Sequence, residues 1–140
     1  MKEYILERII LFRSNGGIIM NFIELENKWL NCMFEADFID KNILVKQAEK
    51  SVISTLYEEG FITIKFSNLQ GDKYPHSVRV PIEMRAFQEE SAPIVFMLHV
   101  IDGYLDELEI FSADGSTINV DNISLDKLEY VIDPEVSCDN

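Results

Sequence analysis

The residues of this sequence most able to do chemistry are carboxylates, and they gather late in the chain. Five of them lie in the run HVIDGYLDELEIFSADGS, which holds no lysine or arginine: Asp102, Asp106, Glu107, Glu109 and Asp114. Paired carboxylates act as general acid and base when their environments separate their pKa values. The same groups also bind metal ions or form an acidic surface that attracts a basic partner. All three kinds of site are candidates for this run.

The spacing of these acids determines which face of a strand each side chain would occupy. Side chains alternate between two faces of a strand, so Glu107 and Glu109 are expected to share a face with Leu105 and Phe111. Asp106 is expected on the opposite face. Two glutamates at this spacing fit a small carboxylate-dependent enzyme. They equally fit a solvated rim flanked by two apolar anchors, and the neighbouring Tyr104 and Phe111 are typical of a protein-binding patch.

Sites for metals, cofactors and nucleophilic catalysis have little support in the sequence. His76 and His99 do not pair with a nearby histidine or cysteine at ligand spacing, and His99 lies in the apolar run VFMLHVI. No calcium loop, phosphate loop or dinucleotide fingerprint occurs. Cys32 and Cys138 lack the features of a catalytic site, and we expect both to be thiols. The sequence therefore predicts no catalytic residue, no metal and no cofactor.

The charge is concentrated in the last quarter of the chain. The formal net charge is −13; residues 1–101 carry 14 acids and 11 bases, whereas residues 102–140 carry 11 acids and only Lys127 as a base. A negative field of this kind repels nucleic acid and anionic lipid and attracts a basic protein. We therefore expect no direct nucleic-acid binding and no membrane binding. A solvated acidic surface that only aids solubility would give the same pattern.

The chain of 140 residues fits one domain, residues 1–140, with residues 134–140 as a flexible tail. Charged residues such as Glu3 and Glu7 interrupt the apolar stretch near the N-terminus, so it does not fit a signal peptide. We expect a cytoplasmic protein.

Helical patterns occupy the first part of the chain. Residues 4–15 fit a short helix, and the spacing of apolar residues predicts another over residues 22–33. Alternation over residues 32–38 predicts an extended segment. The clearest helical pattern begins at Asp40, a plausible N-cap, and runs to Glu59 before Gly60.

Strand patterns follow the helical ones. The run FITIKF places Thr63 and Lys65 opposite Ile62, Ile64 and Phe66, and residues 76–87, 92–101 and 104–111 are also predicted to be strands. Asp102-Gly103 is a favourable two-residue hairpin turn. Helices first and strands later predict an α+β domain, with N-terminal helices packed on one antiparallel sheet formed mainly by the C-terminal half.

One segment resembles a known family. LHVIDGYLDELEIFSADGSTI, residues 98–118, is similar to a segment of small bacterial immunity proteins of contact-dependent inhibition and related polymorphic toxin systems. In that segment an apolar strand, a glycine turn and an L-x-E-I strand precede a D-G turn. The resemblance implies a non-enzymatic inhibitor that binds a cognate toxin C-terminal domain, often a nuclease such as an RNase. It would cover the toxin's active site or substrate surface.

Charge and position select the residues expected to bind such a toxin. They are Asp102, Tyr104, Asp106, Glu107, Glu109, Asp114, Asp121 and Asp126. Two alternatives remain: a small enzyme that uses Glu107 and Glu109, and an acidic adaptor that binds several basic proteins. Whether the protein forms a homodimer is left open.

Overall fold

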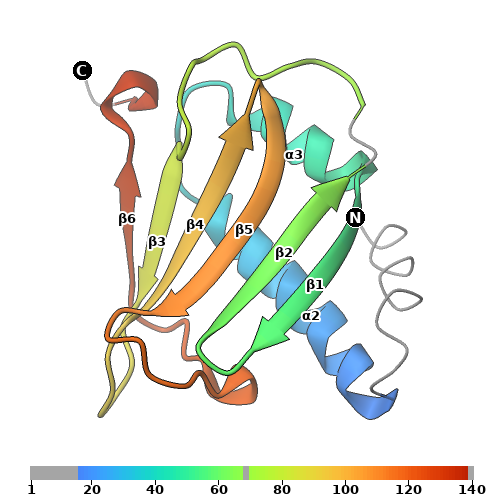
Figure 1. Ribbon diagram of the computed structural model, residues 1–140. Coiled ribbons are helices and arrows are strands. Elements are labelled where there is room, and N and C mark those ends of the chain that lie inside the picture. Colours follow the sequence, from blue (N-terminus) through green and yellow to red (C-terminus); the bar gives the residue numbers. More distant parts are fainter. Residues whose placement is uncertain (1–15, 68–69, 139–140) are drawn as a thin grey trace.

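The computed structural model describes the backbone of residues 16–67 and 70–138, and the side chains from residue 24 onward (Figure 1). Within these residues two helices precede a six-stranded sheet, α2 (Gly16–Met33) and α3 (Lys41–Lys50). The strands are β1 (Val52–Glu58), β2 (Phe61–Ser67), β3 (Ile82–Ala86), β4 (Ile94–Ile101), β5 (Tyr104–Ser112) and β6 (Leu128–Ile132). The predicted α+β arrangement is confirmed. The helix predicted over residues 4–15 lies outside the described residues.

The sheet is antiparallel throughout, with the strand order β1-β2-β5-β4-β3-β6. The predicted hairpin turn between β4 and β5 is confirmed. Asp102 and Gly103 have φ angles of 53° and 84°, and a two-residue turn with positive φ at both positions matches the twist of the flanking strands. The hairpin brings the acidic strand β5 to the middle of the sheet, between β2 and β4.

Both helices pack on one face of the sheet, behind it in the view of Figure 1. Trp29, Leu30 and Met33 of α2 are fully buried, and the Trp29 ring lies 6.0 Å from that of Phe96 on β4. Leu44 of α3 is fully buried as well. Burying apolar side chains between the helices and the sheet is the main favourable term in a fold of this kind. We call this the inner face, and the opposite side the outer face.

A buried glutamine joins the helical layer to the sheet. The Gln47 side chain on α3 is 1 % exposed. Its Nε2 donates to the carbonyl oxygens of Asp72 and Gly103, each at 2.9 Å, and its Oε1 accepts from the Leu105 amide at 2.9 Å. A buried amide is stabilising only when its donors and acceptors are paired, and here they are. This network fixes α3 against the β4–β5 turn.

The long helix predicted from Asp40 to Glu59 is wrong in its second half. Helix α3 ends at Lys50, where the Ser51 hydroxyl donates to the Ala48 carbonyl at 2.8 Å, and the chain continues as β1. The residues of β1, VISTLYE, are rich in β-branched and aromatic types that favour strands. The apolar residues that completed the helical pattern belong to a hairpin with β2.

The expected caps of that helix are also different. Asp40 precedes α3 with a φ of 58° and makes no side-chain capping bond; its carboxylate lies 2.8 Å from His76 Nε2 instead. Gly60 lies in the turn between β1 and β2.

The extended segment predicted over residues 32–38 is not a strand. Helix α2 continues to Met33, the Phe34 amide donates to the Leu30 carbonyl at 3.0 Å, and the chain then turns. Phe38 is 4 % exposed, whereas Phe34 and Ala36 are partly buried against the core. The alternation therefore reflects a turn packed on the core.

The strand predicted over residues 76–87 is shorter than expected, because residues 76–81 are irregular and β3 begins at Ile82. Pro81, just before β3, has no amide hydrogen to donate to a ladder.

Part of the predicted flexible tail is packed. Pro134–Val136 forms a 3-10 turn, η3, whose first amide is capped by Asp133 Oδ1 at 2.9 Å. Val136 is fully buried, and its carbonyl accepts from the Ile39 amide at 2.8 Å. One apolar side chain in a polar segment is enough to fix these residues. Residues 139–140 lie outside the described residues. Among the described helices, none has both the length and the apolar character needed to cross a membrane.

Candidate protein-binding face

The outer face of the sheet brings together three of the predicted acids, Asp106, Glu107 and Glu109. No helix of the described residues covers it (Figure 1). The strand registers set its side chains in rows across the sheet. One row reads Glu58, Phe61, Phe111, Val95, Arg85 and Glu129. The next reads Leu56, Thr63, Glu109, Met97, Glu83 and Val131. A third row on the same face, closer to the β4–β5 turn, reads Ser54, Lys65, Glu107 and His99.

A bulge in β5 corrects the predicted assignment of residues to faces. His99 pairs with Glu107 but Val100 pairs with Leu105, so β5 carries one extra residue, Asp106. A bulge of this kind interrupts the alternation of side chains. Leu105 therefore lies on the inner face, 1 % exposed, and does not share the outer face with Glu107.

The bulge also brings Asp106 and Glu107 to the same side. Lys65 Nζ on β2 lies 3.3 Å from Asp106 Oδ1 and 3.3 Å from Glu107 Oε1. Burial acts to lower the pKa of Lys65, but the hydrogen bonds with Glu107 and Asp106 outweigh it, so the pKa is raised. Lys65 is therefore a fixed positive charge between two carboxylates. Lys65 lies about forty residues before these acids in the sequence. The run around the acids contains no base, so this pairing was not predicted.

The third predicted acid of β5 has a partner of a different kind. Glu109 Oε1 lies 3.0 Å from His99 Nε2 on the neighbouring strand β4. His99 is therefore a hydrogen-bond partner of a carboxylate on the outer face. Its other ring nitrogen, Nδ1, is buried and has no hydrogen-bond partner.

The outer face keeps an excess of negative charge after these pairings. Among the described residues it carries six carboxylates, Glu58, Glu83, Asp106, Glu107, Glu109 and Glu129, and two permanent cations, Lys65 and Arg85. Arg85 Nε donates to Glu83 Oε2 at 2.7 Å. The face as a whole therefore presents an acidic surface with few cations of its own.

Asp102 lies in the β4–β5 turn, and Tyr104, which pairs with Ile101, lies beside it at that end of the outer face. Asp102 lines a hollow of about 610 Å³ together with Lys73 and Arg79. The Tyr104 hydroxyl donates to the Gly71 carbonyl at 3.3 Å, and Lys73 Nζ lies 5.9 Å from the centre of its ring. Lys73 lies near the Tyr104 ring and lines the same hollow as Asp102 and Arg79, so basic side chains offset the acid at this end of the sheet.

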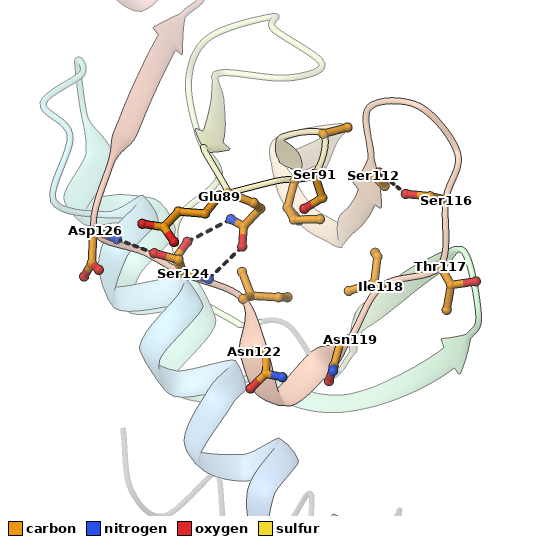
Figure 2. A pocket seen from close by; sticks show the side chains of 14 residues that line it. Glu89, Ser91, Ser112, Ser116, Thr117, Ile118, Asn119, Asn122, Ser124 and Asp126 are labelled. Carbon is orange, nitrogen blue, oxygen red and sulfur yellow. Dashed lines mark hydrogen bonds between the residues drawn. The ribbon is translucent and has the colours of Figure 1, made fainter.

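The last three predicted acids follow β5 in the chain, toward the opposite end of the sheet. A second hollow, of about 520 Å³, lies at this end (Figure 2). Asp126 lines this hollow, whose other lining is mostly hydroxyl and amide side chains without histidine, lysine or arginine. Asp121 lies in the 3-10 turn η2 (Val120–Asn122) and is exposed. Gln88 closes one side of the hollow by bonding both the amide and the carbonyl of Ser124.

Asp114 is held within its own turn and does not point to a partner. Its Oδ1 accepts from the Ser112 hydroxyl at 2.7 Å and from the Ser116 amide at 3.0 Å. Hydrogen bonds from Ser116 and then from Ser112 lower the pKa of Asp114 to about 2. Its carboxylate therefore stabilises the turn that follows β5.

The eight predicted residues consequently form three groups and not one site. A nine-residue strand spans roughly 26 Å, so the two ends of β5 are too far apart to act on one small ligand. Asp106, Glu107 and Glu109 are the group that the outer face brings together.

The geometry gives little support to acid/base catalysis by Glu107 and Glu109. Neither lines the two hollows at the ends of the sheet, and each is paired with a cation or a histidine. In the described part of the chain, no group of three or more His, Cys, Asp or Glu residues could hold a metal ion. Cys32 and Cys138 are free thiols.

Comparison of the chain with protein-family models, curated proteins and solved structures finds no match in any of the three.

Proposed function

We propose that this protein is a cytoplasmic immunity protein that binds and neutralises a basic toxin domain. The toxin is a nuclease, expected to be an RNase, and the protein covers its active site or its substrate surface. The observation that supports the proposal is the outer face of the sheet, an open surface on which carboxylates outnumber cations. The resemblance of residues 98–118 to immunity proteins adds to it, because that segment forms the β4–β5 hairpin at the middle of the same sheet.

Charge explains how such a surface would act. A nuclease cleft is basic because it binds phosphates, so an acidic surface of matching size competes for it. Electrostatic steering raises association rates by about 10- to 1000-fold at low salt and fades as salt screens it. Early encounter matters for an inhibitor that must reach its toxin before the toxin reaches nucleic acid.

The pairings on β5 support rapid binding. Lys65 holds Asp106 and Glu107, and His99 holds Glu109, within a rigid sheet. Side chains that are already ordered lose less conformational entropy when a partner binds. The carboxylates are therefore presented at spacings set by the sheet.

Co-expression with the toxin domain encoded immediately upstream tests this function. Cells should survive the toxin only when the protein is present, and the two proteins should co-purify. Death of the cells despite expression of the folded protein, or failure to co-purify, would show that the proposal is wrong. An acidic adaptor is distinguished by its selectivity, because it would bind unrelated basic proteins with similar affinity.

A charge-matched pair of variants localises the effect. One neutralises the acids of β5: Asp106→Asn, Glu107→Gln and Glu109→Gln. The control neutralises three exposed acids of the helical layer: Glu24→Gln, Glu35→Gln and Glu49→Gln. Both remove the same charge, yet only the first should slow association and flatten its dependence on salt. Equal effects would mean that net charge alone matters and that β5 is not the recognition surface.

A further inference from the structure

Exposed apolar side chains of the described residues gather on the outer face. The exposed fractions of Leu56, Phe61, Ile101 and Val131 are 56 %, 38 %, 43 % and 44 %, and all four lie on this face. In a water-soluble sheet that served only to cover a core, polar residues would be expected at these positions. An exposed apolar patch with a polar rim is typical of a protein interaction site.

Five of the apolar residues on this face form a continuous strip across four strands. We define the apolar strip as Leu56, Phe61, Phe111, Val95 and Met97, which lie on β1, β2, β5 and β4. Leu56 and Phe61 are exposed, Phe111 and Met97 are partly exposed, and Val95 is 8 % exposed and forms the floor of the strip. The register pairs Phe61 directly with Phe111, and Phe111 directly with Val95. Directly paired side chains in antiparallel strands lie about 5 Å apart, so the two aromatic residues are neighbours. Of these five residues, only Phe111 was predicted from the sequence to belong to a protein-binding patch.

Carboxylates border the apolar strip. Glu58 is paired with Phe61, and Glu109 is paired with Met97. Glu83 is the partner of Met97 on the other side, and it binds the guanidinium of Arg85, so the cation nearest the strip is already neutralised. The centre of the surface is thus apolar and its border is acidic.

We infer that the apolar strip is the docking site for the basic toxin, taking an apolar group of the toxin that is surrounded by lysine or arginine side chains. Glu58 and Glu109 would meet those basic side chains. This inference rests on the proposed function and specifies the surface and the chemistry of its partner. Charge complementarity selects this occupant over a second copy of the chain, because two copies would bring like-charged carboxylates together.

The sheet holds the strip in a binding-ready form. Its neighbours along the strands, Ile62 and Ile110, are fully buried on the inner face and fix the backbone that carries Phe61 and Phe111. Rigid aromatic anchors at the centre of an interface, with a rim that excludes water, contribute most of the binding energy in many complexes. Truncation of an anchor should therefore act mainly on dissociation, whereas neutralisation of the rim acts mainly on association.

Three single substitutions test the docking site with the purified toxin domain encoded immediately upstream. Phe61→Thr removes an anchor and keeps a residue type that favours strands. Leu56→Lys places a positive charge at the most exposed position of the strip. Ile101→Thr is the matched control, because Ile101 is similarly exposed on the same face but lies about 20 Å along β4 from Val95.

The expected result separates the strip from the rest of the face. Phe61→Thr and Leu56→Lys should each raise Kd roughly 30-fold or more. Ile101→Thr should change Kd by about threefold or less. Thermal melting verifies that each variant is folded, and Leu56→Lys keeps the test decisive if Phe61→Thr does not fold, since its side chain is more than half exposed.

The outcomes separate the docking site from the function. If wild type neutralises the toxin and both strip variants bind like wild type, the docking site is wrong while the function stands. If light scattering shows a wild-type homodimer that Leu56→Lys dissociates, the strip joins two copies and the inference is overturned.

If wild type does not bind the toxin, the proposed function fails and a peptide of alternating lysine and leucine becomes the probe. Shifts of the Phe61 and Phe111 amide signals that Leu56→Lys abolishes would support a docking site for basic partners. Shifts confined to other residues would overturn it.

Discussion

The side chains on the two faces of strand β5 differ in burial and in their contacts. On the inner face Leu108 and Ile110 are fully buried against the helical layer. On the outer face Glu107 and Glu109 are partly exposed and bond to side chains of the neighbouring strands. Packing density constrains the inner residues, whereas the outer residues tolerate change because water replaces lost contacts. Stability is therefore expected to depend on one face and recognition on the other.

Adjacent residues of β5 give the largest expected contrast. Leu108→Ala should lower the free energy of unfolding by about 3 kcal/mol, because it leaves a cavity in the core. Glu107→Ala, one residue away, should cost less than about 1 kcal/mol, since its ion pair with Lys65 is solvent-exposed. Urea denaturation measures both. Similar losses for the two variants would break the division between the faces.

The buried glutamine extends the contrast to the helical layer. Gln47→Ala should lower the free energy of unfolding by about 2 kcal/mol, because it strands the Leu105 amide and two carbonyls without partners. Its exposed neighbour offers the control, and Lys46→Ala should change stability by about 0.5 kcal/mol or less. Thermal and urea unfolding should agree on the order. A neutral Gln47→Ala would mean that water satisfies these groups.

Lys65 gives a contrast between stability and binding. Lys65→Met should change the free energy of unfolding by less than about 1 kcal/mol, because the side chain is half exposed. The same change removes a positive charge from the outer face, so association with a basic toxin should become faster at low salt. Stopped-flow mixing at two salt concentrations measures this rate. Slower association would indicate that Lys65 is needed to position Asp106 and Glu107.

Asp114 supplies the smallest expected effect and concerns pH. Its pKa is about 2 in the folded protein, below the ordinary value of 3.8. A lowered pKa means that the charged form favours folding, so this contribution is complete above about pH 4 and is lost as the pH falls toward 2. An NMR titration of the Asp114 carboxyl carbon should give a midpoint near 2. Asp114→Asn should remove the corresponding acid dependence, and a midpoint near 4 would contradict the hydrogen-bonded turn.

Local patterns predicted the parts of the fold that depend on local chemistry. The alternation in FITIKF gave β2, and Asp102-Gly103 gave the central hairpin, because both signals reside in a few consecutive residues. The same alternation places Phe61 on one face with Thr63 and Lys65, so the position of Phe61 on the outer face could have been predicted from the sequence.

Features that depend on distant residues were not predictable in this way. The bulge at Asp106 arises from pairing with β4, and it reversed the face of Leu105. Lys65 reaches the acids of β5 only because β2 and β5 are neighbours in the sheet. Val136 is buried because its segment packs beside Ile39, which is distant in the sequence. No pattern in the C-terminal residues predicts this contact.

The bond between the Leu105 amide and the Gln47 side chain has a consequence for hydrogen exchange. Most amides of a sheet are protected by strand carbonyls, so they exchange when the strands separate. The Leu105 amide instead donates to a helix side chain, and it is released as soon as α3 lifts from the sheet. Partial openings of this kind occur at lower free energy than global unfolding. A single exchange rate, compared with that of its neighbours in β5, therefore measures how firmly the helical layer is attached while the sheet remains intact.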